Sequence, residues 1–348
     1  FKVGKIFLPF DFLSLNIWIF YALTFYVFGL TFFYGDINDF LKSFPRASLM
    51  PLSLIFFYNF LNLNKFDKIL KIYLIVSLIG ALSLVYQVFF EPLDFIVSGG
   101  GLREGLPRYA TTMGSLTVYG GTVGILLVLS SLLKMNFLFK LTLLIIFTIS
   151  SFFCMSKAGI MNLFIFLFFY IFFFRMKYKF AIILSSILLF YILFFYVEEI
   201  NDYVLASINS LSINENKPTG LEHQFIFRFF GFHSLEQHSF WNNIFGFGLI
   251  GGQGAFGLPT SIAGTTHNQF FDAIQIGGAL LFLNILCIFV CLLCDLFKYY
   301  IKENDYLSKI FFYCTIIAII NMFFFNGFLY QPTTSFVIWL SVTYLLKK

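Results

Sequence analysis

Long apolar segments separated by short polar connections follow one another along almost the whole chain. A helix needs about 20 apolar residues to cross a bilayer, and fewer where neighbouring helices shield it. The pattern predicts an all-α integral membrane protein with about ten transmembrane helices in a single polytopic membrane domain over residues 1–348. The predicted spans are 12–34, 47–61, 72–90, 113–133, 139–155, 159–174, 180–197, 268–297, 310–326 and 333–346. The second and the last are short enough to be re-entrant, and the eighth is long enough to extend beyond the hydrocarbon.

Basic residues in the short connections predict the side on which each connection lies, because inner loops of membrane proteins are enriched in Lys and Arg. With both chain ends inside, six consecutive inner segments hold most of the 22 basic residues. They are Lys2, Lys5, Lys65, Lys68, Lys71, Lys134, Lys140, Arg175, Lys177, Lys179, Lys298, Lys302, Lys309, Lys347 and Lys348. The outer side then has two substantial loops, a first one over 91–112 and a long one over 198–267 between spans seven and eight.

Composition supports a membrane protein and excludes several other classes. Hydrophobic residues make up 59% of the chain and charged residues 11%, against about 25% charged residues in soluble domains. The net charge of +5 is small and scattered, so we expect no nucleic-acid partner. The five Cys lie within apolar segments and indicate packing rather than disulfides or a metal site. Gly246 to Gly251 spells G-x-G-x-x-G, but no βαβ unit surrounds it, so it does not indicate a dinucleotide.

Most Arg residues lie on the predicted outer side, where basic residues are normally few. Four of the five Arg lie on the predicted outer side, at positions 46, 103, 108 and 228. The planar guanidinium binds phosphate and carboxylate in a bidentate manner, which an ammonium does not. Arg103 and Arg108 stand beside Gly-rich backbone, and together these groups suit an anion-binding cradle. The alternatives are an ordinary surface turn and Arg side chains that extend to the membrane interface.

Two further outer segments contain candidate residues. Ser156-Lys157-Ala158-Gly159 is a tight turn between spans five and six, with a lone cation at the membrane boundary. All four His lie in the long loop or at its end, and the last is His267, followed by Asn268. A neutral imidazole there can accept a proton from a hydroxyl near neutral pH, or it has only a structural role. The acidic residues at 198, 199 and 202 favour a solvated helix end over a metal site.

The order of these features resembles the O-antigen polymerase and O-antigen ligase superfamily. An Arg-containing outer segment (103–112) precedes a span, and the turn 156–159 joins two spans. The long loop runs from Arg228 to Trp241 and then to a Gly-rich segment over 246–257. The pair His267-Asn268 comes before a span with early glycines at 277 and 278.

The resemblance implies a GT-C-like membrane glycosyltransferase in the bacterial inner (cytoplasmic) membrane, with its active site facing the periplasm. The donor would be a polyprenyl-pyrophosphate-linked oligosaccharide, and neither a metal nor a cofactor would be needed. Carried over by position, Arg228, Arg103, Arg108 and Lys157 would stabilise the leaving pyrophosphate, although Lys157 stands where the family more often has Arg. His267 would orient or deprotonate the acceptor hydroxyl, with inversion at the anomeric carbon. Asn268 and Trp241 would position the acceptor or the loop.

The acceptor separates the two members of the superfamily. A polymerase transfers glycan to another lipid-linked repeat unit, whereas a ligase transfers it to lipid A core. We favour the polymerase because the outer loops are compact, and the expected partners are membrane lipid and a chain-length regulator. A flippase or transporter of lipid-linked oligosaccharide is the alternative from another class, but it should place its cations in a central cavity on both halves of the membrane.

Overall fold

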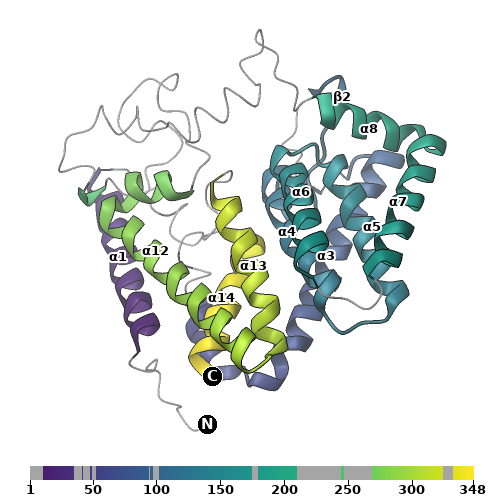
Figure 1. Ribbon diagram of the computed structural model, residues 1–348. Coiled ribbons are helices and arrows are strands. Elements are labelled where there is room, and N and C mark those ends of the chain that lie inside the picture. Colours follow the sequence, from purple (N-terminus) through teal and green to yellow (C-terminus); the bar gives the residue numbers. More distant parts are fainter. Residues whose placement is uncertain are drawn as a thin grey trace. The chain divides into compact units, whose positions relative to one another are not determined.

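The computed structural model describes residues 11–34, 41, 48, 52–93, 95–96, 102–174, 179–209, 244–246, 269–323 and 332–348. Almost all of them are helical (Figure 1). The chain forms two compact units, which are described separately. Unit 1 comprises Phe1–Phe66 and Glu222–Lys348, and unit 2 comprises Asp67–Leu221. The predictions that the chain works as a single membrane domain, and that 91–112 and 198–267 are outer loops, stay predictions.

Unit 1 contains the helices α1 (Phe12–Tyr34), α12 (Gln269–Lys302), α13 (Tyr306–Met322) and α14 (Pro332–Lys347), with a short 3₁₀ helix η1 at Leu63–Lys65. Residues 52–60 are also helical. Helix α12 packs against α1, α13 and α14. One polar contact joins α1 to α12, where the buried Asn284 amide donates to the carbonyl oxygen of Asn16 at 2.9 Å. Such a bond ties helices together where apolar surface alone gives little preference for a neighbouring helix over lipid.

Unit 2 contains α3 (Phe66–Phe89), the hairpin strands β1 (Leu102–Arg103) and β2 (Leu106–Pro107), and five further helices. These are α4 (Leu116–Leu132), α5 (Phe137–Phe153), α6 (Lys157–Phe172), α7 (Lys179–Tyr196) and α8 (Glu198–Asn209). Helix α4 is buried along nearly its whole length and packs against α5 and α6. It therefore forms the centre of the unit.

Within the described ranges, three helices are long and apolar enough to cross a membrane, at Phe12–Phe32, Leu63–Phe89 and Ile276–Lys302. A fourth span results if the bent pair Ile183–Tyr196 and Glu198–Asn209 is counted as one. Shorter apolar helices lie at Leu116–Leu132, Phe137–Phe153, Lys157–Phe172 and Tyr306–Met322, where the sequence predicted spans. A helical, apolar, membrane-spanning architecture is thus supported, while the number of ten spans stays a prediction.

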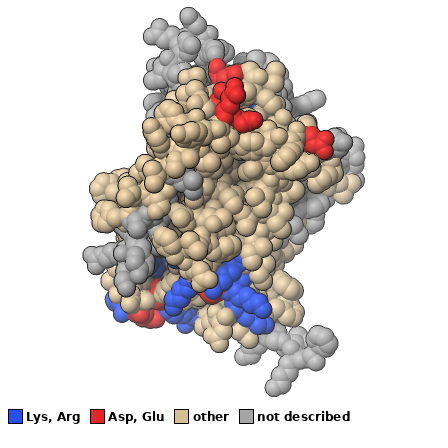
Figure 2. Space-filling view, turned by 90° about the vertical axis from the view of Figure 1, so that its right-hand side faces the viewer, with Lys and Arg blue, Asp and Glu red and all other residues tan. Residues whose placement is uncertain are grey.

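Charge separates toward opposite ends of the face drawn in Figure 2. Lys and Arg gather at one end together with a few acidic residues, other acidic residues lie at the opposite end, and a broad band between them contains neither. In unit 2, exposed Lys134 lies between α4 and α5, and Lys71 pairs with Asp67 at 2.6 Å near the start of α3. Exposed Glu198 and Glu199 begin α8. An uncharged band between charged ends is the distribution that a bilayer selects.

The segment predicted as one long helix over 268–297 is broken near its start. Gly278 has φ 72° and ψ −173°, so α12 consists of a short first segment and a longer second one (Figure 1). This conformation is essentially restricted to glycine. The backbone of Gly246 packs directly against the break, since a Cβ atom on Gly246 would lie 2.5 Å from the Gly278 nitrogen. Tyr26 of α1 donates to the carbonyl oxygen of Phe245 at 3.0 Å. Gly246 and Gly278 therefore allow a close contact between two backbone segments within unit 1.

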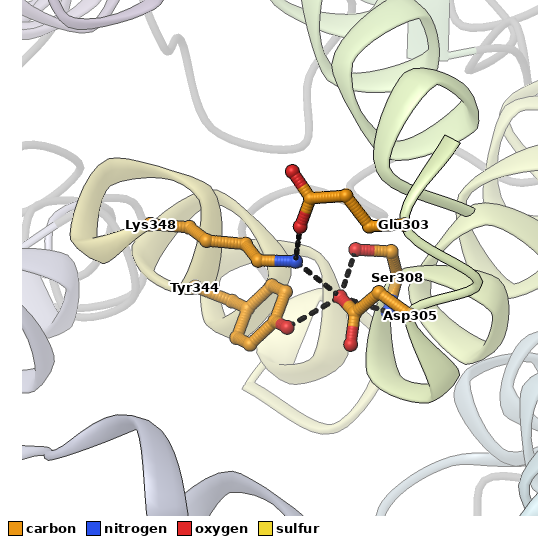
Figure 3. Close-up of polar contacts among 5 residues, drawn as sticks. All are labelled: Glu303, Asp305, Ser308, Tyr344 and Lys348. Carbon is orange, nitrogen blue, oxygen red and sulfur yellow. Dashed lines mark hydrogen bonds and ion pairs between the residues drawn. The ribbon is translucent and has the colours of Figure 1, made fainter. Parts of the chain in front are cut away.

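Asp305 connects three parts of unit 1 (Figure 3). Its carboxylate accepts a hydrogen bond from the Ser308 backbone N–H at 3.2 Å and another from the Ser308 hydroxyl, which caps α13. It also accepts from the Tyr344 hydroxyl at 2.5 Å and pairs with Lys348 Nζ at 3.0 Å, while Lys348 Nζ lies 2.8 Å from Glu303. Burial raises the pKa of the Asp305 carboxyl, but hydrogen bonds from Ser308, Tyr344 and Lys348 outweigh it, so the pKa lies below its ordinary value.

Replacing Asp305 with Asn is expected to lower the free energy of unfolding by about 1–2 kcal/mol, because a hydrogen-bonded charge is lost while an Asn side chain can still cap the helix. A carboxyl whose folded pKa is depressed stabilises the fold above its unfolded pKa of about 3.9 and loses this contribution as pH falls through the folded pKa. The difference in melting temperature between wild type and Asp305→Asn should therefore shrink below about pH 4. Glu303→Gln is the control, because Glu303 is 52% exposed and surface pairs contribute little. An equal loss of stability in Asp305→Asn and Glu303→Gln would contradict the prediction that the more buried carboxylate contributes more.

Candidate anion site in unit 2

Three of the seven sequence-predicted site residues lie in the described part of the chain, and all three belong to unit 2. They are Arg103, Arg108 and Lys157. The other four, Arg228, Trp241, His267 and Asn268, lie outside the described residues, so their roles stay predictions. The geometry below therefore concerns the segments that contain Arg108 and Lys157.

The segment containing Arg103 forms a tight hairpin. Leu102 pairs with Pro107 and Arg103 with Leu106, and the turn residues Glu104 and Gly105 have φ of 49° and 82°. Positive φ at both central residues is the geometry of a type I′ turn, which favours glycine at the second of them. Gly105 thus serves the turn itself, and the anion cradle expected around Arg103 and Arg108 stays a prediction. The hairpin leads directly into Arg108.

The backbone on both sides of Arg108 is held by side chains from other helices. Tyr203 of α8 donates to the Pro107 carbonyl oxygen at 2.8 Å, and Figure 1 shows α8 beside the hairpin. Gln87 of α3 donates to the Ala110 carbonyl oxygen at 2.8 Å. Hydrogen bonds in both directions between Thr111 and Gly114, each 3.0 Å, close the next turn. Arg108 is therefore held on a fixed backbone, which a binding site requires for precise placement of its side chains.

The Arg108 side chain is half-buried, and its Nε is inaccessible to solvent with no hydrogen-bond partner among the described residues. Burial lowers the pKa of Arg108, and the nearby Cys154 thiol raises it. The guanidinium nevertheless stays charged, since an Arg side chain does not lose its proton in proteins. A buried donor without a partner carries a desolvation cost of about 1–3 kcal/mol. An anionic ligand that accepts from this nitrogen would remove that cost.

Lys157 is the first residue of α6, and only 8% of its surface is exposed. A cation at this position is opposed by the positive end of the helix dipole and by its own desolvation. An anion would be stabilised there both by the ammonium and by the N–H groups of the first helical turn. Cys154, Met155 and Ser156 connect α5 to α6, with Met155 at φ 45°, so Lys157, Ala158 and Gly159 of the predicted turn instead form the first turn of α6.

Close packing between α4 and α6 determines where this turn lies. The Asn162 amide donates to the Gly120 carbonyl oxygen at 2.8 Å. A Cβ atom on Gly120 would lie 2.5 Å from Ser156 Oγ, and one on Gly159 would lie 3.2 Å from Cys154 Sγ. Helix α6 is thus the helix that approaches Gly120. This contact brings the start of α6 next to α4.

Helix α8 contacts the Arg108 segment and the end of α5. Tyr203 binds the Pro107 carbonyl, and Ser207, one turn later, donates to the Phe152 carbonyl oxygen at 3.1 Å, at the end of α5. The Tyr203 ring also packs edge-on against Phe153 at 5.2 Å. Sequence analysis missed both residues. Their position could have been found from the spacing of four residues that recur three or four positions apart and are all buried on one face of α8. They are Ile200, Tyr203, Val204 and Ser207.

We predict that Tyr203→Phe lowers stability by about 1 kcal/mol through loss of one hydrogen bond. It should also lower glycan transfer several-fold, because Arg108 loses one of its two anchors. The double variant Tyr203→Phe/Arg108→Ala should be no slower than Arg108→Ala alone, since a positioning residue acts only through the group it positions. Melting temperature and initial rates check this, with the exposed Tyr196→Phe as control. A further loss of rate in the double variant would contradict positioning.

The acidic residues that begin α8 lie at an exposed helix end. Glu198, Glu199 and Asp202 are exposed. Within the part of the chain that the structure describes, no group of three or more His, Cys, Asp or Glu side chains is arranged to hold a metal ion. No protein-family model, curated protein or solved structure matches the chain. The chemistry of the residues themselves therefore carries the functional argument.

Proposed function

We propose that this protein is an O-antigen polymerase, a glycosyltransferase that joins surface-polysaccharide repeat units. The observation that carries the proposal is the pair of cations in unit 2. Arg108 is half-buried, with an Nε that has no hydrogen-bond partner among the described residues, and Lys157 is buried. Cys154, three residues before Lys157, lies close enough to Arg108 to raise its pKa. Two desolvated cations at the end of an apolar helical bundle suit a lipid-linked pyrophosphate, because charge-assisted hydrogen bonds to an oxyanion are strong in a low-dielectric site.

The proposed reaction is a single displacement. A hydroxyl oxygen of the acceptor glycan attacks the anomeric carbon of the donor, and the bond between that carbon and the pyrophosphate oxygen breaks. The hydroxyl proton passes to His267, and polyprenyl pyrophosphate leaves with the electron pair of the broken bond. Arg108, Lys157, Arg103 and Arg228 stabilise the charge that develops on the leaving group. Attack opposite to the leaving group inverts the anomeric centre.

We also propose the membrane in which the protein lies and the side on which its site opens. The chain would cross the bacterial inner membrane ten times in a GT-C-like fold, with both ends inside and the site facing the periplasm. Three apolar helices of spanning length and the separation of charge in Figure 2 support a membrane setting. A chain-length regulator is the expected protein partner.

Incubation of the purified protein with a polyprenyl-pyrophosphate-linked repeat unit tests the proposal. A ladder of multiples on a gel is the expected result. Transfer only after addition of lipid A core would instead establish a ligase. The absence of product in both assays, together with movement of the lipid-linked unit across vesicle membranes, would overturn the proposal in favour of a transporter.

A further inference from the structure

The polar residue Gln87 lies near the end of the apolar helix α3, and only 4% of it is exposed. Its side-chain nitrogen donates to the Ala110 carbonyl oxygen at 2.8 Å and to the Ser83 carbonyl oxygen at 3.1 Å. Its side-chain oxygen accepts from the Leu93 backbone N–H at 3.3 Å. A glutamine amide has two N–H donors and one oxygen, so both donors and the oxygen are used here. One buried amide therefore binds the chain at two places, before and after Arg108.

Two more residues of α3 contact the chain just after the second of these places. The Ser83 hydroxyl oxygen accepts from the Thr112 backbone N–H at 3.3 Å. The Met113 side chain lies against Gly80, since a Cβ atom on Gly80 would be 2.5 Å from Met113 Cγ. Together with the glutamine, these positions of α3 are three and four residues apart, so they share one face of the helix. The segment 110–113 thus lies along this face and is held by α3.

We propose that Gln87 is a positioning residue for the Arg108 guanidinium. The inference rests on the proposed function, in which Arg108 stabilises the leaving pyrophosphate, and it gives Gln87 a role that acts only through Arg108. Tyr203 of α8 holds the carbonyl one residue before Arg108, and Gln87 of α3 holds the carbonyl two residues after it. The two anchors come from different helices, so the backbone between them is held on two sides. A group held in this way needs less ordering when its ligand binds.

The bond to Leu93 distinguishes Gln87 from the other anchor. Leu93 comes before the hairpin of β1 and β2, and Ala110 comes after it, so the same amide holds together two points that are distant along the chain. Joining such points costs conformational entropy, which the fold supplies once and the ligand does not supply again. Removing the amide should therefore loosen both points together.

Amide hydrogen exchange of the purified full-length protein in detergent measures the two points directly. Gln87→Met keeps the length of the side chain and removes its three hydrogen bonds. We expect exchange at Leu93 and Thr111 to rise about tenfold in this variant, although the Thr111 N–H has a partner other than Gln87. Ser77→Ala is the matched control, because the Ser77 hydroxyl is also buried on α3 but donates to a carbonyl oxygen of its own helix, at 2.7 Å. It should leave both exchange rates unchanged.

Initial rates of glycan transfer, normalised to folded protein, test whether the loosening reaches Arg108. Gln87→Met should lower the rate about tenfold, because a displacement of about 1 Å can cost up to about 100-fold. The double variant with Arg108→Ala should be no slower than Arg108→Ala alone. Gln87→Glu adds a rescue test, because a protonated carboxyl donates to the Ala110 carbonyl oxygen and an ionised one does not. Its rate relative to wild type should rise as the pH is lowered from about 8 to about 6, since burial raises the pKa of a carboxyl.

Three results would overturn the role of Gln87. Exchange that stays slow at Leu93 or at Thr111 in Gln87→Met would contradict a shared anchor. A wild-type transfer rate in Gln87→Met, under conditions where Arg108→Ala is slow, would contradict positioning. A double variant clearly slower than Arg108→Ala would show that Gln87 acts on something other than Arg108.

The proposed function fails on different evidence. If the wild type makes no ladder, the polymerase is wrong, and binding of inorganic pyrophosphate replaces the transfer rate as the readout of Arg108. Weaker binding in Gln87→Met than in wild type and Ser77→Ala would still support the positioning role. Equal binding in all three proteins, or no binding by the wild type, would overturn that role together with the polymerase.

Discussion

Replacing Arg108 with Ala is expected to lower the rate of glycan transfer about 10²–10³-fold, the usual effect of removing one group that stabilises a developing oxyanion. The reason is the placement of this side chain. It is half-buried on a backbone held by Tyr203 and Gln87, so the position of its guanidinium is restricted. The measurement is the initial rate of product formation from the lipid-linked repeat unit, normalised to the amount of folded protein.

Two further variants test whether the positive charge of Arg108 or the planar shape of its guanidinium is needed. Arg108→Lys keeps the positive charge but loses the planar fork, so we expect an intermediate rate. Lys68→Ala removes an exposed cation from α3 at the predicted inner side and should leave the rate unchanged. If Arg108→Ala retains the wild-type rate while Tyr203→Phe slows the enzyme, Tyr203 acts on something other than Arg108, and the anion site is wrongly assigned.

Replacing Gly278 with Ala is expected to destabilise unit 1 by roughly 3 kcal/mol or more, which combines a backbone conformation reserved for glycine with a steric clash. At φ 72° and ψ −173° an alanine is strained, and its Cβ atom would overlap the Ile244 carbonyl oxygen. The contact between the 244–246 segment and the break in α12 cannot persist in this variant. Membrane-inserted yield and melting temperature in detergent measure the loss.

Gly29→Ala is the control for this prediction. Gly29 lies within α1, and nothing stands within 4 Å of a Cβ atom placed there. Alanine favours helix over glycine by about 1 kcal/mol, so this variant should be neutral or slightly more stable. A Gly278→Ala protein with wild-type yield and melting temperature would show that α12 can continue as a regular helix, and that the break is not needed for folding.

Several features of the fold were predictable from sequence because they depend on local chemistry. Helices occur where the apolar segments predicted them, for example at Phe12–Tyr34 and Phe137–Phe153, because in hydrocarbon a backbone must satisfy its hydrogen bonds internally. Small and polar residues at 156–159 indicated a break between two apolar segments, and the structure has that break at 154–156. The choice of Arg103, Arg108 and Lys157 followed from their residue type and predicted side, but not from any geometry.

The tertiary structure decided what the local pattern could not. The anchor of Arg108 joins residues 96 positions apart, Tyr203 and Pro107, and no local signal encodes such a pairing. The break at Gly278 likewise depends on a distant partner, because glycine within a helical segment is compatible with a continuous helix until another backbone, here Gly246, must come close. Whether a segment forms a helix thus depends on its own length and on hydrogen bonds within it. Which helix holds which side chain depends on packing between segments, and only the folded chain determines that.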